Sequence, residues 1–232
     1  MPTIDIRGVI VPNNELFAYE WFGLDATAPK NVQQVLQEAK GDNVDVIINS
    51  NGGDVQAGVE IYTMLREYRG KVRIRIQSFA ASAAAVISQA GESEMSPAGL
   101  FMIHNVSGGA KGDYRAMDHA SQTLSTANHA LAAAFAAKSG KTEKEVLELM
   151  DREAWFTAEQ AVREGFVDRI MFTENSQNSN PVRLAASHGS GLLPQNVIEY
   201  ARAHFNNRTG QHCDSAAAEA EYNYLLLKGE TK

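Results

Sequence analysis

The chain has 232 residues, of which 44% are hydrophobic and 21% charged, and its formal net charge is −7. This composition is typical of a globular chain that buries a core, and the acidic balance argues against a nucleic-acid partner, which needs clustered Lys and Arg. The single cysteine, Cys213, excludes an intramolecular disulfide and a cysteine-based zinc site. No apolar run approaches the roughly 18 residues that span a bilayer, so we expect a cytoplasmic protein with no membrane partner.

Strands and helices are predicted to alternate along the first three quarters of the chain, which indicates an α/β fold with a parallel sheet and right-handed crossovers. Short β-branched or alternating runs predict the strands, and apolar residues at helical spacing, with caps, predict the helices. In chain order, the predicted elements are strand 4–11, helix 29–39, strand 43–48, helix 55–68, strand 72–77, helix 83–90, strand 100–103, and then helices 113–139, 142–150 and 157–165 and strand 167–172.

The character of the chain changes after Phe172. Residues 173–189 are rich in Asn and Ser and indicate a linker, and two amphipathic helices are predicted beyond it, over 194–205 and 216–227. We therefore predict a domain over 1–172 and an extension over 173–232, which is either a docking or disordered tail or an assembly extension that binds a scaffold.

Ser82 lies at a predicted strand-to-helix junction between alanines. Serine becomes a nucleophile only with a general base within hydrogen-bond reach and donors for the oxyanion. The small neighbours leave its hydroxyl unhindered, and the backbone N–H of Ala83 is available to an oxyanion. The simpler interpretation of Ser82 alone is an N-cap of the alanine-rich helix.

Gly52 and Gly53 follow the predicted strand 43–48. Glycine lets the backbone turn sharply and brings an N–H close to a ligand without a Cβ in the way. Alone, such a pair indicates a turn and nothing more.

His104 ends the predicted strand 100–103, and histidine is the side chain best suited to accept a serine proton near neutral pH. Without a motif it would be interpreted as a strand-end histidine with structural hydrogen bonds. The other histidines lack the spacing and carboxylate neighbours of a metal site, so we expect neither metal nor cofactor. These are His119, His129, His188, His204 and His212.

Together, Asn49-Ser50-Asn51-Gly52-Gly53, Ala80-Ala81-Ser82-Ala83-Ala84 and Met102-Ile103-His104 resemble the Clp protease proteolytic subunit family. The resemblance covers about 4–172 and is strongest to the phage-type branch, the head maturation (prohead) proteases. It implies the ββα superhelix of Clp protease and crotonase folds, with a mainly parallel sheet and a long handle helix. It also implies serine endopeptidase activity.

The resemblance implies roles for these residues. Ser82 is the nucleophile and His104 the general base, while Gly53 and Ala83 form the oxyanion hole and Gly52 belongs to the turn beside the substrate strand. Asn51 replaces a proline of the family motif, which loosens the turn without removing the donor at Gly53.

The third member of the triad has two candidates. The family pattern Asp-Arg-Asp, followed by an aromatic pair, corresponds here to Asp151-Arg152-Glu153. The aligned position is Glu153, and glutamate can orient a catalytic histidine. Its extra methylene leaves Asp151 as the alternative acid. Arg152 resembles an arginine that helps subunits contact one another.

Two departures favour the phage-type branch. The first predicted strand begins near Ile4, without the family's preceding segment that meets an AAA+ unfoldase, which argues against such a partner. Residues 16–25, with Tyr19-Glu20-Trp21-Phe22, also resemble that branch. We therefore expect ATP-independent cleavage of scaffold or capsid proteins, in the host cytoplasm or the assembling prohead, by homo-oligomeric rings. The alternatives are a catalytically degenerate structural subunit, suggested by Asn51 and Glu153, and a crotonase-type acyl-CoA enzyme.

Overall fold

The computed structural model describes residues 1–173 and 196–199. Its centre is an eight-stranded sheet. The strands are β1 (Thr3–Ile10), β2 (Ala26–Thr27), β3 (Val44–Gly53), β4 (Val72–Ala81), β5 (Glu92–Met95), β6 (Leu100–Ile103), β7 (Ala154–Thr157) and β8 (Arg169–Ile170). They lie in the order β2-β1-β3-β4-β5-β8, with β6 paired to β4 and β7 paired to β6. All pairs are parallel except β6–β7, so the predicted mainly parallel sheet is confirmed.

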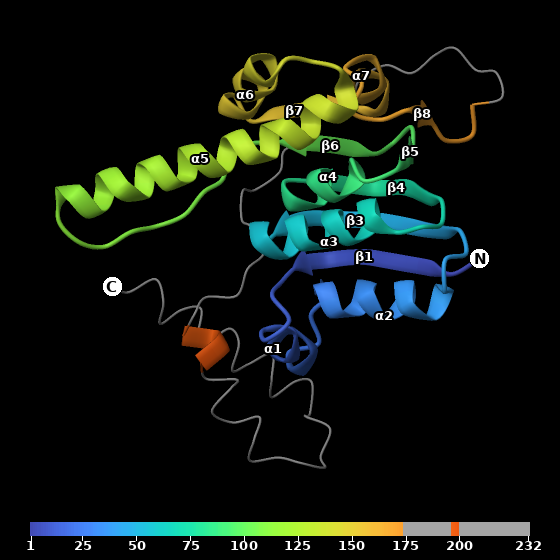
Figure 1. The fold of residues 1–232 in the computed structure, drawn as a ribbon, viewed down its shortest axis with the longest axis horizontal. Helices are drawn as coiled ribbons and strands as arrows, with labels where there is room; N and C mark the ends of the chain where they lie inside the picture. The colour runs from blue at the N-terminus through green and yellow to red at the C-terminus, as the bar shows by residue number, and fades with distance from the viewer. Residues whose placement is uncertain (174–195, 200–232) are drawn as a thin grey trace.

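The helices pack beside this sheet, and the longest one extends beyond it (Figure 1). They are α1 (Leu16–Trp21), α2 (Pro29–Ala39), α3 (Val55–Glu67), α4 (Ala83–Ser88), α5 (Tyr114–Ser139), α6 (Glu143–Asp151) and α7 (Ala158–Arg163). The amino-terminal half of α5 projects away from the body, as the predicted handle helix would (Figure 1). None of the helices in the described part of the chain is long and apolar enough to cross a membrane.

Several helix ends are set by local sequence, as predicted. Thr142 and Thr157 each accept a hydrogen bond from the third residue of the following helix, whose side chain returns the bond, which forms a capping box. Gly140 ends α5 in the left-handed conformation that favours glycine.

The strands that carry the candidate site are longer than predicted. The predictions end at Ile48 and Gln77, but β3 continues through Gly53 and β4 through Ala81. Pairing with neighbouring strands holds the extra residues in place, since Gly53 pairs with Ile10 of β1. The glycine pair is thus part of a strand end.

Other elements have weak local signals. The segments α1, β2, β5 and β7 were not predicted, and the strand predicted over 167–172 is reduced to the two residues of β8. These strands have two to four residues each, so long-range pairing rather than periodicity determines them.

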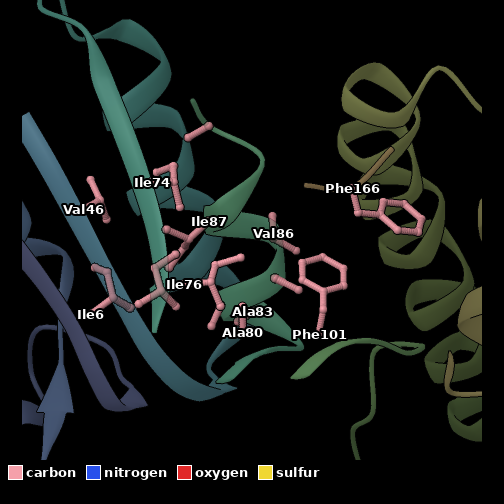
Figure 2. Packing of buried hydrophobic residues seen from close by; sticks show 14 of the residues in the cluster. Ile6, Val46, Ile74, Ile76, Ala80, Ala83, Val86, Ile87, Phe101 and Phe166 are labelled. Carbon is pink, nitrogen blue, oxygen red and sulfur yellow. The ribbon is translucent and has the colours of Figure 1, made fainter. Parts of the chain in front are cut away.

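The core lies between the sheet and α4 (Figure 2). Alternate strand residues meet alanine and branched side chains of α4, and nearly all of them are fully buried. Burying one Val or Ile side chain is worth about 1.5–3 kcal/mol, so this contact fixes α4, and Ser82 before it, against the strand ends. The residues labelled in Figure 2 are Ile6, Val46, Ile74, Ile76, Ala80, Ala83, Val86, Ile87, Phe101 and Phe166.

An aromatic cluster joins the sheet to α5. The ring of Phe166 stacks on Phe101 of β6 at 5.6 Å between centroids and lies 5.4 Å from Phe156 of β7. Phe135 of α5 meets Phe166 edge-on at 5.9 Å. Phe166 itself is fully buried. The cluster therefore holds β6, β7 and α5 together beneath the candidate site.

The other face of the central strands carries ion pairs between neighbours. Arg73 of β4 donates two hydrogen bonds to Asp45 of β3, at 2.6 and 2.8 Å, and Arg75 pairs with Glu94 of β5 at 2.7 Å. Arg169 of β8 continues the series to Glu94. The alternation over 72–77 therefore separates a buried face from a charged one.

Asp168 ties β5 to the end of α5. Burial alone would raise the pKa of this carboxyl, but hydrogen bonds from Lys138 and Ser93 outweigh burial and lower it. A carboxyl whose pKa is lowered in the folded state contributes stability at pH values above its unfolded pKa of about 3.9. That stability is lost as the pH falls through the folded pKa.

We expect Asp168→Asn to lower the free energy of unfolding at pH 7 by about 1 kcal/mol, because the partly exposed Lys138 pair is screened by solvent. The deficit should shrink below about pH 4, where the wild-type carboxyl also becomes protonated. Urea unfolding at pH 7 and pH 3 measures it. The exposed Asp5–Arg7 pair provides the control Asp5→Asn, and equal losses in both variants at pH 7 would contradict this prediction.

Residues 196–199 are helical, and the rest of the predicted helices 194–205 and 216–227 lies outside the described residues. Val197 and Ile198 are buried in a second cluster with Leu16 and Tyr19. This part of the predicted extension therefore contacts the N-terminal part of the fold.

Candidate active site

Parallel pairing of β4 with β6 brings Ser82 and His104 to one edge of the sheet. Ala81 pairs with Met102, and the Ser82 N–H donates to the Met102 carbonyl at 3.0 Å. Ser82 and His104 therefore both lie just beyond the carboxyl ends of neighbouring strands, although 22 residues separate them.

The Ser82 hydroxyl lies 2.8 Å from Nε2 of His104. Ser82 occupies the N-cap position of α4, but its side chain makes no capping hydrogen bond. Its backbone has φ 54° and ψ −123°, a positive-φ conformation that is costly for a residue with a Cβ and is held only by its surroundings. The hydroxyl is thus directed to the histidine instead of the helix end, unlike an ordinary serine cap.

The glycine pair packs directly against this turn. A Cβ on Gly52 would lie 2.7 Å from the Ser82 Cβ, and one on Gly53 would lie 2.2 Å from the Ile10 carbonyl oxygen. Both residues also have positive φ, 96° and 147°. Ser50 supports the turn, because its hydroxyl accepts the Gly52 N–H and donates to the Gly8 carbonyl. Only glycine fits these two positions next to Ser82.

A cavity of about 710 Å³ opens over these residues. Ser82, His104, Gly53 and Glu153 all line it. Ala83, the other predicted oxyanion residue, is buried at 3% exposure and is not among the lining residues. Its position at the start of α4 still leaves its N–H without a carbonyl partner inside the helix.

The strand pair β6–β7 places Glu153 beside the histidine. These strands are antiparallel, and their last pair joins Ile103 to Ala154. The next position along each strand is His104 on one side and Glu153 on the other. Glu153 has φ 51° and its N–H donates to the Met150 carbonyl at 3.0 Å, so a tight turn at the end of α6 delivers it to the cavity.

Asp151, the alternative acid, lies elsewhere. Its side chain is on an exposed residue outside the cavity lining, and its Oδ1 accepts a 2.8 Å hydrogen bond from Nδ2 of Asn105. Of the two carboxylates that the sequence left open, the structure brings Glu153 to Ser82 and His104.

The other two histidines in the described residues do not line the cavity. His119 and His129 are exposed on α5, and His129 pairs with Glu143 of α6. No group of three or more His, Cys, Asp or Glu side chains that could hold a metal ion occurs within residues 1–173 and 196–199.

Sequence reasoning did not anticipate part of the cavity wall. Val86 of α4 and Leu131 and Phe135 of α5 form an apolar side near Ser82. A signal existed, since Leu131 and Phe135 are large apolar residues spaced i, i+4 in an alanine-rich helix, but assigning them to the cavity required the packing of α5 on α4.

Comparison with known proteins gives consistent matches. A family model described as Clp protease matches residues 17–174. The ATP-dependent Clp protease proteolytic subunits of Streptococcus pyogenes serotype M5 (strain Manfredo) and Streptococcus equi subsp. equi (strain 4047) are each 30% identical over 152 residues, covering 62% of this chain and 76% of the relative. A solved structure of a ClpP1 mutant from Listeria monocytogenes aligns with a TM-score of 0.61 and 22% identity, over 75% of this chain and 92% of that one.

Proposed function

Because this chain belongs to the Clp protease family, we propose that it is a serine endopeptidase that uses Ser82, His104 and Glu153. Ser82 is the nucleophile, His104 is the general base and Glu153 is the carboxylate that orients the histidine. The observation that carries the proposal is the 2.8 Å contact between the Ser82 hydroxyl and His104 Nε2 inside the cavity.

In this mechanism, Nε2 of His104 accepts the hydroxyl proton as the Ser82 oxygen attacks the scissile carbonyl carbon. The resulting imidazolium donates that proton to the leaving amine, and the acyl-serine forms. A water molecule then attacks the ester while His104 again accepts a proton, which releases the acid product and restores Ser82. Glu153 favours the histidine orientation and stabilises the imidazolium without being protonated itself.

The oxyanion is assigned to the N–H groups of Gly53 and Ala83. Gly53 lines the cavity, and its neighbour Gly52 packs against Ser82 with no room for a Cβ. Ala83 follows the nucleophile directly. Donors held in this way before reaction stabilise the charge that develops in the transition state, and one such donor is worth about 10²–10³ in kcat.

A fluorophosphonate probe tests this function, because it reacts only with an activated serine. We expect the purified protein to be labelled, and peptide mapping by mass spectrometry to place the label on Ser82. The matched control is Ser88, a buried serine of α4 whose hydroxyl donates to the Ala85 carbonyl; it should remain unlabelled. A folded, assembled protein that stays unlabelled would favour the degenerate structural subunit instead.

We also propose that the substrates are extended segments of phage scaffold or capsid proteins, cleaved without ATP by a homo-oligomeric ring. The support is the resemblance of residues 16–25 to the phage-type branch, together with a cavity of about 710 Å³ that accommodates several side chains of an extended peptide. Co-expression with a scaffold protein, with wild type and Ser82→Ala compared by mass spectrometry of the products, tests this assignment.

A further inference from the structure

Asn105 connects the strand that carries the base to the turn that carries the acid. It follows His104 directly, and its Nδ2 donates to Oδ1 of Asp151 at 2.8 Å across 46 residues of sequence. A carboxylate can only accept, so the amide nitrogen must face Asp151. The amide oxygen is buried and accepts no hydrogen bond from the described residues, so the bond to Asp151 is what determines the orientation of this amide.

The far end of this hydrogen bond lies at a strained turn. Asp151 is the last residue of α6, and Glu153 follows two positions later with φ 51°. A left-handed conformation at a residue with a Cβ costs about 1–3 kcal/mol and persists only when its surroundings impose it. On one side Ala154 is held by its pairing with Ile103. On the other side, the Asn105–Asp151 bond holds the end of α6.

A second hydrogen bond restrains the base side of the same junction. The Val106 N–H donates to Oδ1 of Asn128 on α5 at 2.7 Å. The two residues that follow His104 are therefore attached to two different helices, Asn105 to α6 and Val106 to α5. Without these attachments, the histidine would be followed at once by the long loop that leads to α5.

We propose that Asn105 and Asp151 form a positioning pair that sets the distance and angle between His104 and Glu153. The proposal rests on the proposed function of that site. In this pair, Asp151 does not orient the histidine itself. Its carboxylate accepts the hydrogen bond from Asn105 and thereby fixes the position of the turn from which Glu153 reaches the cavity. Asn105 lines the cavity next to His104 and Asp151 does not, and neither side chain takes part in the bonds that form or break.

A double-mutant cycle in the full chain tests the pair, with hydrolysis of a fluorogenic peptide as the readout. We expect Asn105→Ala and Asp151→Ala each to lower kcat about tenfold, with KM changed less than about twofold, because a small misplacement of the base affects chemistry more than binding. The double variant should be no slower than either single variant. Asp151→Asn keeps an accepting oxygen and should recover most of the loss.

Gln34→Ala is the matched control, because Gln34 makes a comparable amide-to-carboxylate hydrogen bond, 3.0 Å to Glu38, on the exposed surface of α2. Losses that multiply in the double variant, an effect on KM alone, or single variants as active as Gln34→Ala would each overturn the positioning pair while the proposed function stands, since wild type would still be labelled and active.

A second readout is independent of turnover. In protein labelled with ¹³C-histidine, the ring signal of His104 is identified by its loss in His104→Gln. We expect Asn105→Ala and Asp151→Ala to move this signal in the same way, with no further change in the double variant. An unmoved signal would overturn the proposal even in a protein that hydrolyses nothing, whereas an unlabelled, inactive wild type would overturn the proposed function instead.

Discussion

Replacing Ser82 with alanine is expected to lower kcat for peptide hydrolysis by at least about 10⁵-fold, because it removes the proposed nucleophile that forms the acyl intermediate. The remaining rate would come from binding and from oxyanion donors acting on water. The variant should fold, because the Ser82 hydroxyl hydrogen-bonds to His104 and does not cap α4. Alanine loses no core packing at this position.

Steady-state hydrolysis of a fluorogenic peptide measures the effect, with circular dichroism and gel filtration to show an unchanged fold and assembly. Ser107→Ala is the matched control, since Ser107 also lines the cavity but has no predicted role in the chemistry. Activity in Ser82→Ala within about tenfold of wild type would exclude Ser82 as the nucleophile, because loss of a nucleophile is never that small.

Replacing Glu153 with glutamine is expected to lower kcat about 10³-fold, since the neutral side chain cannot stabilise the imidazolium and can favour the wrong tautomer of His104. Asp151→Asn should have a much smaller effect, less than about tenfold, because the asparagine oxygen still accepts the hydrogen bond from Asn105. KM should change little in Glu153→Gln, because the loss concerns the transition state.

The two variants are matched, since each converts one carboxylate to its amide without changing its shape, and they lie two residues apart. The measurement is kcat for both variants at several pH values, with fluorophosphonate labelling rates as an independent readout of nucleophile activation. If Asp151→Asn were the slower enzyme, the assignment of Glu153 would be wrong and Asp151 would be the orienting acid.

The parts of the candidate site that the sequence predicts best are those determined locally. The apolar runs before Gly52 and Ser82 and the run that ends at His104 predict three strands, and the order of strands and helices predicts a parallel sheet. Carboxyl ends of parallel strands meet at one edge of a sheet. The convergence of Gly53, Ser82 and His104 follows from these patterns together with the family resemblance, and the described structure has them along one cavity.

The strand ends illustrate the limit of local patterns. Apart from Phe79, residues 49–53 and 78–81 are asparagine, serine, glycine and alanine, which carry little strand propensity, yet β3 and β4 extend through them. Backbone hydrogen bonds to β1 and β6 keep these segments extended. The positive φ of Ser82 is likewise absent from any pattern in the sequence, because the packing around the turn imposes it.

By itself, the sequence determined which residues could carry serine-protease chemistry and the class of fold that would bring them together, because alternation, capping and motif spacing act within a few turns of the chain. Only the tertiary structure placed Glu153, and not Asp151, along the cavity with Ser82 and His104, and revealed the Asn105–Asp151 bond. Both outcomes depend on the antiparallel register of β6 with β7 and on the turn at the end of α6. The groups in these contacts are about 50 residues apart in the chain, and a side chain's direction at such a junction is set by the pairing of distant strands, which no local pattern encodes.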